Sequence, residues 1–215
     1  MEPSDAGESA LRELWACSHD AWIGPVGAAS PEEAVYMSSA ACAAATHRNQ
    51  DCWPPWVHAA HALTSPAACR CDDPAHARSE GGGRGLFGLT AANPLGQDRP
   101  HEENSQRNFS LKNEIQELCA ASRGVWWRGF GFAADWHEEG FIVAAERDSV
   151  MALAQKYEQG AIFEFRRAPG QGAAFLRSTV PVCLAHTEAD VLTVPVDRPA
   201  METADPHWLP RDARC

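Results

Sequence analysis

Two polar segments of the sequence combine side chains that could bind a ligand. The first reads as a turn that ends at Asn93, followed by the start of a helix near Pro100. Residues 103, 104 and 107 would then share one face of the first helical turns. Free N–H groups at a helix start bind polar or anionic groups, and arginine adds a fork of donors. The predicted ligand-binding residues are Asn93, Glu103, Asn104, Arg107, Trp136 and Glu138.

The same cluster also has a structural interpretation, and the sequence favours it. Asparagine in turns and near helix starts usually caps free backbone groups. Arg107 follows Glu103 by four positions, a spacing at which opposite charges pair on a helix surface. Both interpretations stay open at this stage.

A Gly-Phe-Gly-Phe stretch resembles part of an RNA-binding signature. Arg128–Ala133 is similar to the RNP1 motif, whose aromatic side chains stack on bases. That motif belongs on the strand directly before the second helix, and Phe141–Ala145 occupies this place here. Asp135 also stands where the last aromatic residue of the motif is expected. RNA binding is therefore a third, disfavoured hypothesis.

A histidine and cysteine group in the first third of the chain is a weak candidate for zinc. The residues are His58, His61, Cys69 and Cys71. The Cys-x-Cys spacing differs from the Cys-x-x-Cys of common zinc sites, so we expect no metal. The chain shows no nucleophile elbow and no Walker loop. We therefore predict no cofactor and no catalytic residue, and favour a protein that is not an enzyme.

Several tryptophans lie outside the best-patterned part of the chain. Tryptophan dominates many interface hot spots, so these side chains could dock on partners. They could equally pack back on the protein's own sheet. The candidate interface residues are Trp15, Trp22, Trp53, Trp56 and Trp208.

Composition narrows the classes of partner. The chain has 215 residues, 45% of them hydrophobic, and a net charge of −11. This charge disfavours nucleic acid and anionic membranes. No apolar run is long enough to span a bilayer, and the acidic N-terminus lacks a secretory signal pattern. We expect a cytoplasmic or organelle-interior protein that is not secreted, in which the eight cysteines are free thiols.

The elements that must position these residues are indicated by hydrophobic periodicity between residues 85 and 167. Apolar runs and period-two alternation predict four strands, and apolar spacing of i, i+3, i+4 and i+7 predicts two helices. Their order is strand, helix, strand, strand, helix, strand. This order predicts an α+β, ferredoxin-like β-α-β-β-α-β sandwich with a mostly antiparallel sheet.

The flanks read differently. Residues 1–84 are predicted to be an Ala-, Pro- and Cys-rich extension with a helix near 31–47, because Ser30-Pro31-Glu32-Glu33 is a typical helix start. Residues 85–187 form the predicted α+β domain, in which Phe175–Leu184 could add a strand or hairpin. Residues 188–215 are predicted to be an extended tail.

Several motifs in the same order carry a resemblance to a known family. They are Thr90–Pro94, Glu103-Asn104 with Arg107 and Leu111, Trp136–Val143 and Leu153–Phe163. Over about residues 89–163 the chain resembles the bacterial family of unknown function numbered 3293 (DUF3293). Gly160 departs from the asparagine that the family pattern has there. The resemblance implies no established activity.

Three hypotheses for function follow. The first is a non-enzymatic accessory subunit that contacts other protein chains of a larger assembly through its flanking tryptophans. The second is a small-ligand-binding or catalytic domain that uses the Asn93–Arg107 cluster. RNA binding is the third.

Overall fold

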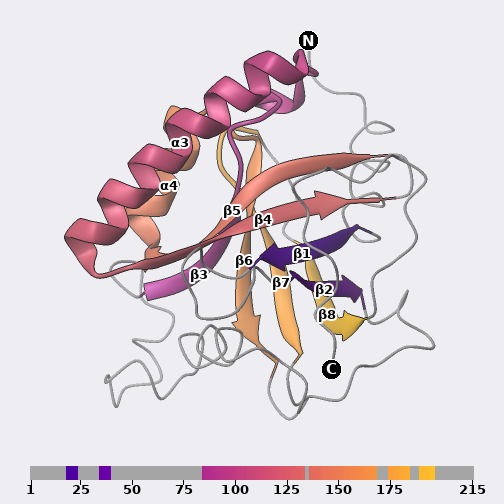
Figure 1. Ribbon diagram of the computed structural model, residues 1–215. Helices are drawn as coiled ribbons and strands as arrows, with labels where there is room; N and C mark the ends of the chain where they lie inside the picture. The colour runs from indigo at the N-terminus through magenta and orange to yellow at the C-terminus, as the bar shows by residue number, and fades with distance from the viewer. Residues whose placement is uncertain are drawn as a thin grey trace.

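The computed structural model describes residues 18–23, 34–39, 84–133, 136–168, 174–184 and 189–196. Eight strands in this part of the chain form one closed barrel, in the order β1-β2-β8-β7-β6-β3-β5-β4, and every neighbouring pair is antiparallel (Figure 1). The elements are β1 (His19–Ile23), β2 (Ala34–Ser39), β3 (Arg84–Leu89), the short 3₁₀ helix η4 (Pro94–Gly96), α3 (His101–Ser122), β4 (Val125–Phe132), β5 (His137–Glu146), α4 (Arg147–Lys156), β6 (Ala161–Arg167), β7 (Phe175–Pro181) and β8 (Asp190–Val196).

The predicted ferredoxin-like sandwich is wrong. Between residues 84 and 167 the elements follow one another along the chain as the periodicity indicates. A sandwich, however, would leave β4 and β6 as free edges. Instead β4 pairs with β1, and β6 pairs with β7. β2 and β8 complete the ring, so none of the eight described strands is a free edge.

Side-chain alternation along the strands separates a barrel interior from an exterior. One buried cluster joins Trp22 of β1, Val35 of β2, Trp127 of β4, Ile142 of β5 and Phe175 of β7, which are strands from all round the ring. These residues therefore fill the interior. Since successive strand residues point to opposite faces, Phe141 and Val143 point outward from β5.

The two helices cover one side of the barrel wall from outside (Figure 1). Leu111, Ile115 and Cys119 of α3 are buried with Val150 and Ala154 of α4. They share a buried cluster with the outward-facing residues of β3 and β5. The spacing of these apolar positions is the helical one that the sequence shows, so burial of this stripe explains why both segments are helices.

The flanks contribute strands to the same barrel. β1 and β2 lie in the region predicted to be an N-terminal extension, and β8 lies in the predicted tail. The helix predicted near residues 31–47 is wrong for Ala34–Ser39, which form a strand; the rest of that range lies outside the described residues. Val35 and Met37 alternate with Tyr36, and pairing with β1 and β8 outweighs the helix-favouring alanines around them.

Two of the eight cysteines fall in the described ranges, and both Cys119 and Cys183 are free thiols. In the same ranges, no helix is long and apolar enough to span a membrane.

Candidate functional site

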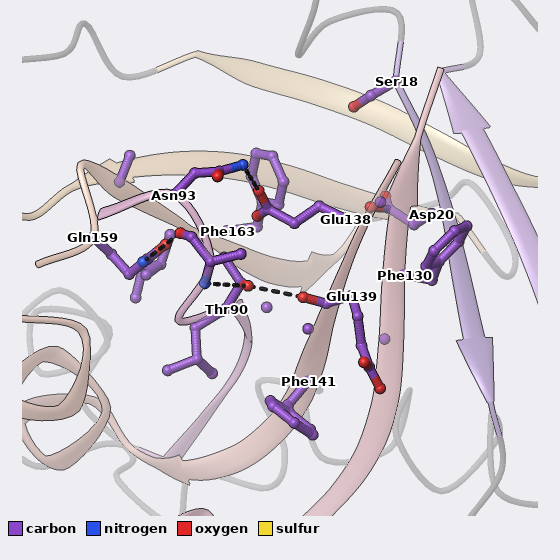
Figure 2. Close-up of a pocket in the computed structure, with 18 of the residues that line it drawn as sticks. Ser18, Asp20, Thr90, Asn93, Phe130, Glu138, Glu139, Phe141, Gln159 and Phe163 are labelled. Carbon is purple, nitrogen blue, oxygen red and sulfur yellow. Dashed lines mark hydrogen bonds between the residues drawn. The ribbon is translucent and has the colours of Figure 1, made fainter. Parts of the chain in front are cut away.

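A pocket of about 330 Å³ lies at one end of the barrel, where β3 ends and β5 and β6 begin. We call it the barrel-mouth pocket. Its lining includes Thr90, Asn93, Trp136, Glu138 and Gln159, together with residues of β1, β4 and β6 (Figure 2). The interior below the pocket is filled by the buried cluster that includes Trp22, Trp127 and Phe175. The pocket is therefore a part of the barrel interior that the described side chains leave open.

Glycines in adjacent strands create this space. Asp20 of β1 pairs with Gly131 of β4, which pairs in turn with Glu138 of β5. In the next row inward, Gly129 pairs with Gly140. Residues directly opposite each other in neighbouring strands point to the same face. Gly131 therefore leaves the wall bare between the two acidic side chains, and Gly129 and Gly140 leave it bare in the next row.

Two of the glycines also permit close contacts. A Cβ on Gly131 would lie 3.4 Å from the Trp136 ring, which lies against the backbone there. A Cβ on Gly140 would lie 2.7 Å from the carbonyl oxygen of Leu89, closer than real Cβ atoms approach. Gly140 is thus required by the β3–β5 contact, whereas Gly131 has room for a methyl group.

Glu138 presents its carboxyl group to the pocket. Asn93 Nδ2 donates a hydrogen bond of 3.0 Å to Glu138 Oε2 (Figure 2). Burial raises the pKa of Glu138 to about 7, and hydrogen bonding from Asn93 and Thr90 acts in the opposite direction. Near neutral pH this carboxyl group therefore exists in both its acid and its ionised form.

Asp20 lies across the pocket from Glu138 and is held in a buried ion pair. Arg177 Nη1 donates to Asp20 Oδ2 at 2.7 Å, and the two side chains are 1% and 8% exposed. Burial raises the pKa of Asp20, while the charge of Arg177 and its hydrogen bond oppose this. The arginine also lies over the Phe163 ring, 4.7 Å from its centroid. Arg177 is thus committed to two neighbours inside the barrel.

Helix α3 positions the segment that carries Asn93. Asn108 Oδ1 accepts from the N–H of Ala91 at 2.8 Å, and Asn104 Oδ1 accepts from the N–H of Asn93 at 2.9 Å. Asn104 Nδ2 also donates to Asn93 Oδ1 at 2.9 Å. Asn93 is left-handed, with a φ of 47°, a conformation that asparagine tolerates better than most residues. These contacts direct the Asn93 amide at Glu138.

Arg107 of α3 also holds the segment that carries Asn93. Its Nε donates to the carbonyl oxygen of Ala91 at 2.8 Å, and its Nη2 donates to that of Tyr157 at 2.8 Å. Arg107 also lies 3.7 Å from Glu158, not against Glu103 as the structural interpretation had it. Glu103 instead forms an exposed pair with Arg99. Arg107 is therefore a positioning residue.

The structure divides the predicted ligand-binding residues in two. Asn93, Trp136 and Glu138 line the barrel-mouth pocket, whereas Glu103, Asn104 and Arg107 do not. Asn104 and Arg107 bind backbone groups of the segment that carries Asn93, as the structural interpretation expects of such residues, and ligand binding at the pocket stays a prediction.

Of the predicted interface and zinc residues, the described part of the chain contains Trp22 alone. Trp22, a predicted interface residue, is 0% exposed and packs on Phe165 and Phe175 in the barrel interior. Trp15, Trp53, Trp56 and Trp208, like the zinc candidates His58, His61, Cys69 and Cys71, lie outside the residues described. Within the described ranges no group of three His, Cys, Asp or Glu side chains could hold a metal ion.

Sequence reasoning missed several lining residues. Asp20 and Trp22 lie two positions apart in a five-residue strand, so both point inward. Period-two alternation in the segment His19–Ile23 is the signal that could have identified these two residues as inward-facing. The segment is too short for this alternation to stand out. Gln159 donates to the carbonyl oxygen of Ala92 at 3.1 Å, and in the sequence it stands out only as part of the family motif.

Comparison with known proteins gives one match, to a family model. Residues 89–162 match the model of the family described as "Protein of unknown function (DUF3293)", which confirms the resemblance seen in the sequence. No curated protein and no solved structure matches the chain. The matched range contains Thr90, Asn93, Trp136 and Glu138, while Asp20 lies outside it. The pocket is therefore built partly by the family segment and partly by the rest of the chain.

Proposed function

We propose that this protein binds a small molecule in the barrel-mouth pocket. The observation that carries the proposal is the pocket itself: about 330 Å³ at the open end of a closed barrel, with an apolar floor and two inward-facing carboxyl groups. Small-molecule sites are typically concave and mostly apolar, with a few placed polar groups, and barrel mouths are a common place for them. The volume is near the lower end for such sites, which favours a small ligand.

Polar groups in the lining support a ligand rather than a packing defect. A defect in a core is normally lined by apolar side chains alone. Here Glu138 offers a carboxyl group whose pKa lies near 7. The indole N–H of Trp22, a lining residue, has no hydrogen-bond partner in the described part of the chain. A bound molecule could contact both groups.

The hypothesis of an accessory subunit stays a prediction. Its five tryptophans include Trp22, which is a core residue and cannot dock on a partner. A protein that binds a small molecule could still work inside an assembly, so the two functions are compatible.

The RNA-binding hypothesis is weakened by burial. Phe130 and Phe132, the aromatic residues of the RNP1-like stretch, are 3% and 1% exposed and belong to a buried cluster. Stacking on bases requires exposed rings on a sheet face.

A fragment screen on the whole protein tests the proposed binding. Ligand-detected NMR of wild type would be compared with Gly131→Leu, whose side chain would fill the space between Asp20 and Glu138. We expect hits on wild type that disappear in Gly131→Leu. Gly131→Ala, which places only a methyl group in ordinary contact with Trp136, should weaken them.

The exposed residue Phe109 on α3 provides the control. Phe109→Ala should bind the same fragments as wild type, and circular dichroism should show that each variant is folded. Equal binding by wild type and a folded Gly131→Leu would contradict the proposal.

A further inference from the structure

We propose that the ligand of the barrel-mouth pocket is a small organic ammonium ion with an apolar body, whose charged nitrogen binds Glu138. This inference rests on the proposed function and specifies the class of molecule bound. Four features of the pocket carry it: the row of acidic side chains, the absence of a cation among the described lining residues, the aromatic floor and the protonation of Glu138.

The acidic row has room for a charged group in its middle. Asp20 and Glu138 are separated by Gly131 in the paired strands β1, β4 and β5. Two strand spacings place their Cα atoms about 10 Å apart. Gly131 adds no side chain between them. The Glu138 carboxyl group accepts a hydrogen bond from Asn93, whereas the Asp20 carboxyl group is paired with Arg177. A nitrogen bonded to Glu138 would therefore lie on the acidic side of the pocket without displacing the Asp20–Arg177 pair.

No cation lines this space in the part of the chain that the structure describes. Among the described residues that line the pocket, four are acidic and none is lysine, arginine or histidine; the acidic ones are Asp20, Asp98, Glu138 and Glu139. The two nearby arginines are engaged with other groups. Arg177 pairs with Asp20 at 2.7 Å, and Arg128 lies 3.6 Å from Glu139. An anionic ligand would meet repulsion here, whereas a cation would find a counter-ion.

Glu138 is the carboxyl group that remains available to a ligand. Glu139 points to the opposite side of β5, as Figure 2 shows, and Asp20 is balanced by Arg177. Glu138 has no cationic partner in the described part of the chain; its partners are the neutral side chains of Asn93 and Thr90. A buried carboxylate is most stable when a cation and hydrogen bonds satisfy it together.

The floor fits the rest of such a molecule. Trp22, Ile142, Phe163 and Phe165 line the pocket below the acidic row, and Trp136 lies at its rim beside Gly131. Apolar atoms of the ligand would be removed from water by these side chains. The faces of aromatic rings also attract cations, most strongly when water is excluded.

Protonation of Glu138 gives the inference a second, independent readout. Without ligand, burial raises the pKa of Glu138 to about 7. A bound ammonium ion favours the ionised carboxylate, so binding near pH 6.5 should release a proton. Among the described residues, the other charged or titratable groups near the pocket are the pairs Asp20–Arg177 and Glu139–Arg128, Asp98 in the lining, and His19, which interacts with Asp20 and whose pKa is lowered by burial. Affinity should rise as pH increases from 5.5 to 7.5.

Titration calorimetry with three matched probes tests the inference on the whole protein. The probes are phenethylammonium, its neutral analogue 2-phenylethanol and the anion 3-phenylpropionate, which share one ring and similar length. We expect wild type to bind phenethylammonium at least tenfold more tightly than either analogue. Repeating the titration in buffers of different ionisation enthalpy would reveal the released proton.

Two glutamate variants separate the pocket from the overall charge. Glu138→Gln keeps the shape of the side chain but removes its charge, and should weaken phenethylammonium binding at least tenfold and abolish proton release. Glu117→Gln makes the same change on the exposed surface of α3 and should stay within twofold of wild type.

The outcomes distinguish this inference from the proposed function. Binding of 2-phenylethanol or 3-phenylpropionate as tight as that of the amine would overturn the ammonium inference and leave small-molecule binding standing. The same holds if none of the three probes binds while the fragment screen finds other pocket ligands. If neither the probes nor the fragments bind, both proposals are wrong.

Discussion

Glu138 is a residue whose local environment changes its pKa. A glutamate at the inner face of a β-strand is desolvated, which disfavours its charged form, and the neutral donors Asn93 and Thr90 compensate only in part. The result is a carboxyl group that titrates near neutral pH. Such a group can respond to a ligand's charge, and it also links the stability of the fold to pH.

We predict that Glu138 makes the empty protein less stable as pH rises from about 5 to 8. Its pKa is raised in the folded state, so the folded state holds the proton where the unfolded state has lost it, and this contribution is lost as pH passes through 7. The loss amounts to at most roughly 3 kcal/mol. Urea unfolding at both pH values should show a smaller pH effect in Glu138→Gln than in wild type; identical effects would refute the assignment.

Helix α3 is the element that holds the site together. Its inner face carries polar side chains, Asn104, Arg107 and Asn108, which bind backbone groups of residues 91–93. A helix in this position thus has two functions: its apolar stripe packs on the barrel, and its polar first turns fix the turn that presents Asn93. The same residues therefore look like a binding cluster in the sequence although most of them are positioning residues.

We predict that Arg107→Ala destabilises the protein by about 2–3 kcal/mol, because two carbonyl oxygens, of Ala91 and Tyr157, lose a charged donor. Glu103→Ala, one turn earlier on the same helix, removes only an exposed ion pair and should cost less than about 0.5 kcal/mol. Denaturant unfolding of both variants would measure the difference. Similar losses in the two variants would argue against this role for Arg107.

Strands β1 and β7 are linked through the barrel interior by Asp20 and Arg177, although they are not neighbours in the sheet. We predict that Arg177→Met costs about 3–5 kcal/mol, since it leaves a buried carboxyl group without its partner. The double variant Asp20→Asn with Arg177→Met should recover much of this loss. Unfolding free energies of the three proteins would show it, and a double variant no more stable than Arg177→Met would count against the ion-pair account.

The whole molecule depends on closure of the sheet. Strands β1, β2 and β8 come from segments that flank the family-matched range, yet they complete the ring and bury Trp22, Val35 and Met37 against residues of β4, β6 and β7. Without them the interior face would be open to water, and β4 would be a free edge.

We predict that a fragment of residues 84–184 does not fold on its own. It lacks three of the eight strands, so interior side chains such as Trp127 and Phe175 would be exposed. The fragment should bind a hydrophobic dye and unfold without a cooperative transition, whereas the full chain should unfold cooperatively. Cooperative thermal unfolding of the fragment would instead support the independent domain that was predicted for residues 85–187.

The sequence by itself determined the elements whose pattern is local and long. The apolar stripes of α3 and α4 and the runs of β3 to β6 repeat at helical or strand period within single segments, so they were predicted in the right order. The motifs around Asn93, Trp136 and Glu138 were sufficient to indicate the family and three of the pocket residues.

Tertiary structure alone decided that the sheet closes and that a pocket remains at its mouth. Closure depends on short strands such as β1 and β2, whose five or six residues carry little periodic signal and whose local alanines favour helix. The buried ion pair inside the barrel joins Asp20 to Arg177, 157 positions apart. Strand pairing and register are properties of such distant contacts, which is why neither the barrel nor its pocket can be read from local patterns.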